Sequence, residues 1–267
     1  MSLYNRGMKI LEPYISKEYL ALKINYCKKQ LSSLPEITPA HRNVRGVNKL
    51  LYLEGNHRYL ATGSSGEELR RIYNLRTDLT CDLTRLEGLW ASEYKRLPTP
   101  DIEPRKIKRR MMISDSSSVV LDGEFFESLK SDANPNHREN KTHYYNGTYY
   151  RSSAEVEIAR FYTEQGIPFK YEPEIRLKGL NFPVYPDFVI YIKELDLCKF
   201  HEHFGMKNSS AYNRSTAVKY TNYSNAGLLP ELDTIFTYDV DFKPFDLREL
   251  SNKLNSAVYG SLFCFDS

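Results

Sequence analysis

The C-terminal half of the chain alternates two kinds of apolar pattern, and this alternation restricts the fold more than any other feature. A helical spacing of apolar residues covers 153–165 and ends at Gly166 and Pro168. Short strand-like runs, a second helical stretch, a further strand and a last helix follow, at residues 169–172, 175–177, 184–191, 197–204, 211–225, 233–238 and 245–254. The order α-β-β-β-α-β, followed by a final helix, predicts an α/β (α+β) fold with a mixed central sheet flanked by helices.

The N-terminal half is predicted to be mainly helical, with one β-hairpin. Apolar residues recur at helical spacing over 15–33 and 66–97, and Gly88 is a point at which the second helix could be interrupted. Between them, residues 48–62 form two apolar stretches around a Gly-Asn pair, which tolerates the positive φ of tight turns. We therefore expect a helical and β-hairpin region, a connector and an α/β domain at residues 1–111, 112–148 and 149–267.

Charge is distributed unevenly along the chain. Residues 1–111 carry 21 Lys and Arg against 12 Asp and Glu, whereas residues 112–267 carry 16 against 22. A basic first part suits contact with a polyanion and an acidic second part suits cation binding, although chance scatter between two solvated regions is an open alternative. One basic run follows three prolines and is either a phosphate-contacting patch or a solvated linker; it comprises Arg105, Lys106, Lys108, Arg109 and Arg110.

Several classes of protein are disfavoured by composition and motif. No apolar run approaches the roughly 20 residues of a membrane helix, and the N-terminus has no signal-peptide core. The segment 61–66 lacks the GK[ST] ending of a phosphate-binding loop, so any nucleotide-driven motor would be a separate chain. The cysteines are too scattered for a zinc ribbon, a local iron–sulfur motif or a disulfide framework: Cys27, Cys81, Cys198 and Cys264. We expect a soluble, intracellular protein of the cytoplasm, with no membrane partner.

Three carboxylates stand where the predicted elements would bring them together. Glu155 lies in the first turn of the helix at 153–165, Asp187 at the start of an apolar strand, and Glu202 near the end of the next. Period-two alternation places Glu202 on the face of Phe200 and Phe204. An acid in such a strand needs a cation or hydrogen-bond donors, and converging carboxylate oxygens favour Mg²⁺ or Mn²⁺.

At these residues the chain resembles a known superfamily. The motifs are RSSAE at 151–155, YPDF at 185–188 and HEHFGM at 201–206. They are similar to the R-S-x-S-E, Y-P-D-F and W-E-H-F-G-M sequences of some branches of the PD-(D/E)XK nuclease superfamily. The resemblance covers residues 150–239.

The resemblance implies a restriction-endonuclease-like core and a metal-dependent phosphodiesterase, in particular an endonuclease or other nuclease acting on DNA. It assigns Glu155, Asp187 and Glu202 as ligands of a Mg²⁺ or Mn²⁺ ion that activates water, with the backbone carbonyl of His203 as a further ligand and Arg151 as a nucleic-acid contact. The expected partners are DNA and either a second copy of the chain or a separate ATPase or recombination protein.

The chain departs from the superfamily pattern at the motif lysine. Phe204 stands two residues after Glu202, where that lysine would be. Lys219, on the following helix, is the best replacement and would share a helix face with Tyr223. Its role would be to hold the attacking water or to offset charge on the scissile phosphate. Lys199 ranks second, because alternation aims it at the face opposite Glu202.

Several alternatives remain open. Asp187 could be an ordinary turn or strand-entry residue, and Glu202 could form a salt bridge with a neighbouring Arg or Lys. Ser152 and Glu155 match a capping box, in which the acid only satisfies backbone donors. His201 and His203 share a strand face and could hold Zn²⁺ or Fe²⁺, although no third ligand is evident. The whole domain could also be a catalytically inactive, nuclease-fold protein that binds DNA or serves in assembly.

Overall fold

The computed structural model describes residues 16–44, 46–104, 108–136, 138–205, 210–239 and 245–263. These residues form six α-helices, one short 3₁₀ helix and several small sheets, including a four-stranded mixed sheet near the C-terminus. The predicted mixed α/β class is therefore confirmed. None of the helices described is long and apolar enough to cross a membrane.

The chain divides into two units. One is Leu20–Glu103, and the other contains the residues from Pro104 onward together with residues 16–19. The division therefore lies eight residues before the expected boundary at residue 111, and the segment 112–148, expected as a separate connector, belongs to the second unit.

The Leu20–Glu103 unit packs a three-stranded antiparallel sheet against a long helix. Its elements are α1 (Lys17–Ser33, of which the first three residues belong to the other unit), β1 (Ile37–Val44), β2 (Val47–Glu54), β3 (His57–Leu60) and α2 (Ser64–Tyr94). The strands lie in the order β1-β2-β3. Ile37 and Tyr52 form a small core with Leu69 of α2, because alternate strand residues point to the same face.

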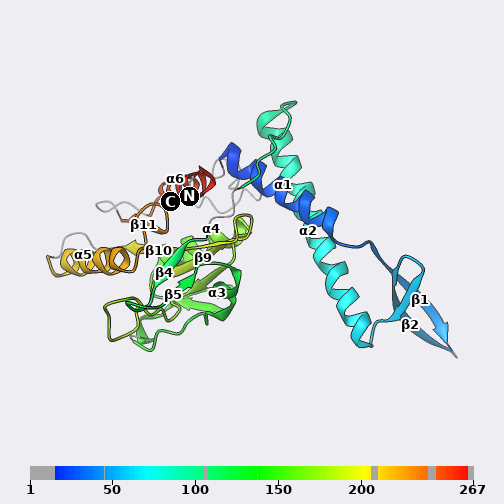
Figure 1. Cartoon of the computed structure of the whole chain (residues 1–267), viewed down its shortest axis with the longest axis horizontal. Helices are drawn as coiled ribbons and strands as arrows, with labels where there is room; N and C mark the ends of the chain where they lie inside the picture. Colours follow the sequence, from blue (N-terminus) through cyan, green and yellow to red (C-terminus); the bar gives the residue numbers. More distant parts are fainter. Residues whose placement is uncertain are drawn as a thin grey trace. The chain divides into compact units, whose positions relative to one another are not determined.

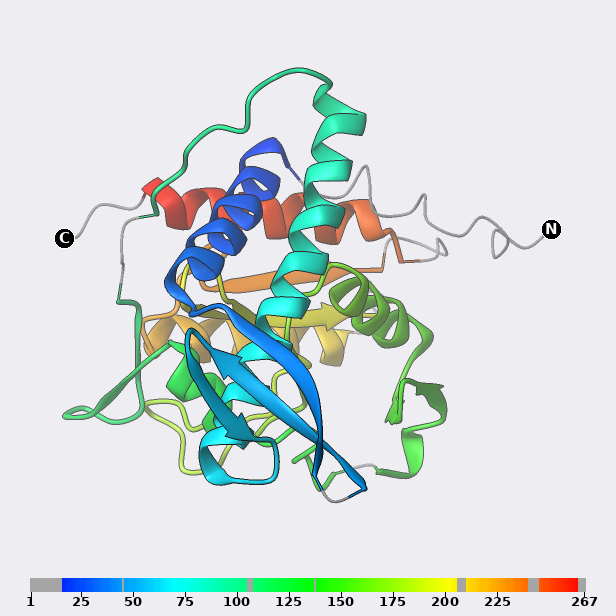
Figure 2. The same cartoon turned by 90° about the vertical axis from the view of Figure 1, so that its right-hand side faces the viewer.

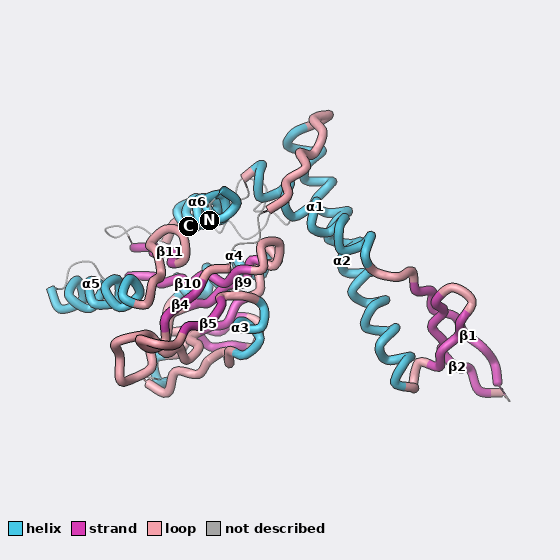
Figure 3. The backbone as a smooth tube through the Cα atoms, in the orientation of Figure 1, coloured by secondary structure: helices cyan, strands magenta, loops and turns pink. Residues whose placement is uncertain are grey.

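Two sequence expectations for this unit can be compared directly with the structure. The hairpin expected at 48–62 is present as β2 and β3, which turn at Gly55 with a φ of +54°. The helix expected at 66–97 is α2, and it runs without interruption through Gly88 (Figure 3). β1 was not expected, since its alternation is disguised by Pro39, which an edge strand tolerates.

The second unit is built around the four-stranded sheet. Its strands are β8 (Phe169–Tyr171), β9 (Phe188–Ile192), β10 (Leu197–Phe204) and β11 (Thr234–Tyr238), in the order β11-β10-β9-β8. β10 is central, antiparallel to β9 and parallel to β11, so the sheet is mixed as predicted. The strand expected at 184–191 begins only at Phe188, and Val184 instead forms an isolated bridge with Ile175.

Helices cover both faces of this sheet. On one face Tyr162 of α4 (Ser153–Glu164) packs against His201, and on the other face Tyr223 of α5 (Ser210–Asn225) packs against Phe200. α6 (Leu247–Phe263) is longer than the expected helix at 245–254. Figures 1 and 2 show α6 and α5 on opposite sides of β11.

The segment before α4 contributes to the same core. It contains β4 (Arg110–Met112), β5 (Ser118–Val120), α3 (Gly123–Ser128), the 3₁₀ helix η1 (Arg138–Asn140), β6 (His143–Tyr145) and β7 (Thr148–Tyr150). Met111, Leu121 and Phe126 are buried in one cluster with Val189 and Phe200 of the sheet. Polar composition suggested a connector, but these few apolar residues fix the segment to the α5 face.

Candidate active site

Asp187 and Glu202 lie at the same end of the β9–β10 pair. Asp187 directly precedes β9, whose first residue, Phe188, pairs with His201 of β10, and Glu202 follows His201 on β10. The charge of Asp187 raises the pKa of Glu202, so the two carboxylates are near each other. The Oδ2 atom of Asp187 also accepts a 2.7 Å hydrogen bond from the backbone N–H of His203, which fixes this carboxylate beside Glu202.

Glu155 reaches the same end of the sheet from the first turn of α4. Its Oε2 atom accepts hydrogen bonds from the Tyr171 hydroxyl at 2.7 Å and from the backbone N–H of Arg151 at 2.9 Å. Tyr171 ends β8, and the backbone N–H of the next residue, Glu172, bonds to the carbonyl of Asp187 at 3.0 Å. β8 therefore connects Glu155 to the Asp187 position.

The capping-box alternative explains the hydrogen bond from the backbone N–H of Glu155 but not those accepted by its carboxylate. Ser152 is the N-cap of α4, and its Oγ atom accepts a hydrogen bond from the Glu155 N–H at 3.1 Å. The Glu155 carboxylate, however, bonds to the N–H of Arg151, one residue before the cap, and to a hydroxyl from a separate strand. Glu155 thus joins α4 to the sheet as well as belonging to the cap at the N-terminus of the helix.

Glu202 is held by two residues of α5. Lys219 Nζ lies 2.6 Å from one carboxylate oxygen, and the Tyr223 hydroxyl donates to the other at 2.5 Å. Glu202 is 1% exposed, whereas the Lys219 side chain is 42% exposed, so a buried acid is paired with a partly exposed lysine. The structure places Lys219 at Glu202, while Lys199 points to the opposite face and donates to the Leu232 carbonyl and to Ser261 Oγ.

Both glutamates have strongly raised pKa values. Burial, reinforced by the charge of Asp187, raises the pKa of Glu155 to about 7 despite the hydrogen bonds that it accepts. Burial also raises the pKa of Glu202 to about 7; Lys219 opposes this rise and Asp187 adds to it. Asp187 is therefore close enough to repel the charge of both neighbours, and perturbed acids grouped in this way are typical of functional sites.

The donor set is chemically suited to a hard divalent cation. All three side chains supply carboxylate oxygens, and within the described residues neither Glu155 Oε1 nor Asp187 Oδ1 accepts a hydrogen bond. The same part of the chain contains no group of three His, Cys, Asp or Glu side chains placed to hold a metal ion as it stands. Both oxygens of Glu202 are bonded to α5, so metal binding would require Glu202 to exchange one of these partners.

The two histidines beside Glu202 point away from the acids. His201 Nδ1 lies 2.8 Å from the Tyr162 hydroxyl, and Thr237 Oγ1 lies 2.8 Å from His201 Nε2 and 3.0 Å from His203 Nδ1. His203 Nε2 lies 3.4 Å from Asp239. Both imidazoles are thus engaged with other side chains, and the hydrogen bond from His203 to Asp187 comes from its backbone N–H.

The basic residues predicted to bind nucleic acid have different surroundings. Arg109 makes a two-pronged ion pair with buried Asp233, at 2.5 and 2.9 Å, so its side chain fastens β4 to the turn before β11. Lys108 and Arg110 are exposed. Arg105 and Lys106 lie outside the described residues.

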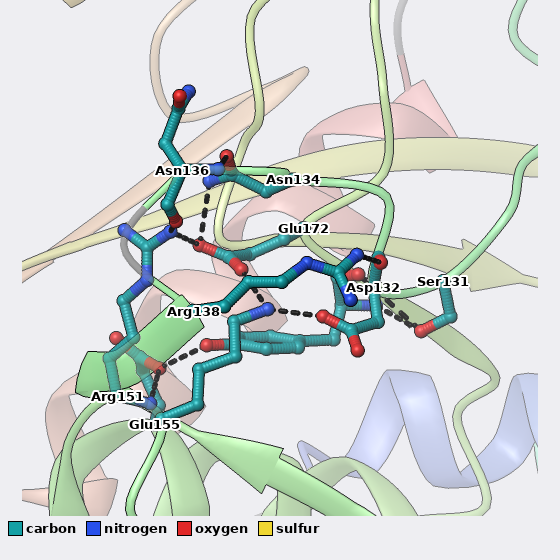
Figure 4. A network of polar contacts seen from close by, with 10 residues as sticks. Ser131, Asp132, Asn134, Asn136, Arg138, Arg151, Glu155 and Glu172 are labelled. Atoms are coloured by element: carbon teal, nitrogen blue, oxygen red, sulfur yellow. Dashed lines mark hydrogen bonds and ion pairs between the residues drawn. The ribbon is translucent and has the colours of Figure 1, made fainter.

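Arg151 belongs to an ion network that surrounds buried Glu172 next to Glu155 (Figure 4). Its Nη2 atom lies 2.8 Å from Glu172 and donates to the Asn136 carbonyl at 2.9 Å. Lys141, whose side chain is 6% exposed, lies 2.5 Å from the second oxygen of Glu172 and also pairs with Asp132. The sequence analysis missed Glu172 and Lys141, because neither has local periodicity or a motif; only the position of Glu172 at the end of a strand-like run was a signal.

Comparisons with protein-family models, curated proteins and solved structures found no match to this chain.

Proposed function

We propose that this protein is a Mg²⁺- or Mn²⁺-dependent nuclease that hydrolyses phosphodiester bonds in DNA. The observation that carries the proposal is the convergence of Asp187 and Glu202 across β9 and β10, with Glu155 linked to them through β8. Separate elements thus supply three acids to one end of one sheet, and the pKa of each glutamate is raised in part by Asp187.

The fold is compatible with a restriction-endonuclease-like core. A mixed sheet with β10 in the middle, α4 on one face and α5 on the other follows the order of elements that the superfamily resemblance implies. The site residues also occupy the corresponding elements: a helix start, a strand entry and a central strand end.

In the proposed mechanism, Glu155, Asp187 and Glu202 would hold the divalent ion. When bound, the ion would make water easier to deprotonate and would stabilise negative charge on the phosphate. Lys219, whose ammonium lies beside Glu202 and whose side chain is partly exposed, is suited to orient the attacking water or a phosphate oxygen. Tyr171 and Tyr223 would position the two glutamates by donating hydrogen bonds to them.

One observation favours a second candidate, a non-catalytic protein that binds DNA or serves in assembly. Lys219 already neutralises Glu202 at 2.6 Å, and among the described residues the acids do not form a closed metal-binding group. Such a protein would bind DNA equally well with or without a divalent cation.

The deciding experiment is a cleavage assay on single-stranded, duplex and branched DNA with Mg²⁺, Mn²⁺ or EDTA. Asp187→Asn and Glu202→Gln should abolish metal-dependent cleavage, whereas Glu157→Gln should not. Glu157 is a matched control, since it is an acid of α4 that pairs with Arg160 at 3.2 Å. If the wild type binds DNA but never cuts it, and both variants bind equally well, the nuclease proposal is wrong and the non-catalytic candidate remains.

A further inference from the structure

One face of the three-stranded sheet in the Leu20–Glu103 unit is not part of the core against α2. Tyr52 and Tyr59, paired across β2 and β3, belong to the side that packs on α2. The pairing of Arg42 with Lys49, and of Arg58 with Leu53, places these three cations on the other side by alternation. Arg42 and Arg58 are exposed and Lys49 is partly so.

The net positive charge of this unit is concentrated in the sheet. Residues 20–103 contain 13 Lys and Arg against 10 Asp and Glu, and residues 37–60 contain 4 against 1. The remainder is balanced, at 9 against 9. The one acid of the strands, Glu54, pairs with Ile37 and His57 and so lies on the α2 side. The opposite side therefore presents cations without a strand carboxylate.

These cations have no anionic partner among the described residues, in contrast to several other cations of the unit. Lys28 pairs with Glu87 and Lys29 with Glu103, whereas Arg42, Lys49 and Arg58 make no ion pair with any residue the structure describes. Arg42 directly opposite Lys49 is moreover a like-charge pair, an arrangement that destabilises a hairpin. An anionic ligand would offset that repulsion.

The shape of the sheet indicates the kind of anion. β3 pairs only with Leu51–Glu54 of β2, so the four outer pairs of β1 and β2, which include Arg42 with Lys49, form a two-stranded ribbon. Figure 1 shows the tip of this ribbon standing apart from α2. A two-stranded ribbon fits the major groove of duplex DNA, which is about 12 Å wide.

We propose that the β1–β2 ribbon, together with the adjoining face of β3, is a duplex-DNA docking surface on which Arg42 and Lys49 of the ribbon and Arg58 of β3 contact the phosphate backbone. The choice of DNA rests on the proposed function, while the surface itself follows from the charge and register of the sheet. Because phosphate contacts carry no sequence information, the surface would contribute affinity and orientation without base preference.

The test measures binding of a fluorescent duplex to the full-length protein in EDTA, over a series of salt concentrations. Arg42→Gln/Lys49→Gln should weaken binding about tenfold or more near 0.1 M salt, and should lower the slope of log K against log salt by about 2. Arg70→Gln/Arg71→Gln removes the same charge from two exposed residues of α2 and should change neither quantity appreciably.

Each other outcome overturns a defined part of the inference. Equal weakening by both double variants would show that only net charge matters, and no weakening by the ribbon variant would show that DNA docks elsewhere. Tighter binding of a matched RNA duplex would exclude DNA as the preferred ligand. Since binding is measured without metal, the inference can stand if cleavage is never observed, and it can fail while cleavage is confirmed.

Discussion

β10 carries buried polar side chains on both of its faces, and the two faces differ in how those groups are satisfied. On the α4 face, His201 has a partner at each ring nitrogen, and burial keeps its pKa well below the ordinary range, so that it is neutral. On the α5 face, Glu202 is opposed by Asp187 as well as paired with Lys219. A satisfied neutral network stabilises the fold, whereas mutual repulsion among acids costs stability and is typical of sites selected for function.

Two buried or half-buried lysines give the sharpest contrast between the faces. Lys219→Met should lower cleavage by about 100-fold or more, because a group that offsets charge at the reacting centre is lost. Lys199→Met should leave cleavage intact but lower the free energy of unfolding by about 1–3 kcal/mol, because the Leu232 carbonyl and Ser261 lose their donor. Denaturant unfolding and cleavage assays on both variants test this; the same loss of cleavage in both would erase the distinction between the faces.

The histidine network is expected to contribute stability alone. Thr237 Oγ1 lies within hydrogen-bond distance of both His201 and His203, so Thr237→Val would leave two buried imidazoles each short of a partner. We expect a loss of about 2 kcal/mol in the free energy of unfolding, with kcat and metal dependence unchanged. A change in metal preference in this variant, measured by comparing Mg²⁺ with Zn²⁺, would instead support the histidine-metal alternative.

Removing one of the clustered acids of the candidate site should stabilise the protein. The pKa values of both glutamates are about 7 in the folded state and lower in the unfolded state, so ionising them above pH 7 lowers the free energy of unfolding. Below about pH 4.5 the glutamates are protonated in both the folded and the unfolded state, and this loss of stability disappears. These acids therefore reduce stability progressively as the pH rises from about 4.5 to about 7. Asp187→Asn removes a shared source of repulsion and should raise the free energy of unfolding in EDTA by about 1.4 kcal/mol at pH 8.

The control for this prediction is the same variant at pH 4.5, where the two glutamates are protonated. There the gain should vanish. A gain of equal size at both pH values would show that Asp187 acts through packing and not through its charge.

The candidate site was more predictable from sequence than the surroundings that tune it. Glu155, Asp187 and Glu202 each lie at a point where apolar periodicity begins or ends, and period-two alternation correctly separated Glu202 from His201. Lys219 could be assigned because one helix face also holds Tyr223, and both contact Glu202. These inferences depend only on local geometry.

Contacts between distant segments could not be predicted in the same way. The pairing of Lys141 with Glu172 joins a polar stretch to a strand end, and nothing in either local sequence specifies the other. The same is true of Arg109, whose basic neighbours suggested phosphate binding although its own side chain is paired with buried Asp233. β1 was missed for a related reason, since an edge strand with Pro39 is defined by the strand that it pairs with.

The smallest expected effect distinguishes the contribution of Tyr223 from that of Lys219, the two residues of α5 that bond to Glu202. Tyr223 donates to Glu202 and lowers its pKa, so Tyr223→Phe should let that pKa rise further and move the acidic limb of the pH–rate profile to higher pH. Metal ligands must be deprotonated to bind, and the limb therefore reports the ionisation of Glu202. The loss of stability should be only about 1 kcal/mol, since Lys219 continues to pair with the acid.

Tyr220→Phe, one turn earlier on α5, removes a hydroxyl that bonds to Tyr238 instead, and it should leave the limb in place. If both variants shifted the acidic limb equally, the position of the limb would depend on the packing of α5 and not on the hydrogen bond from Tyr223 to Glu202.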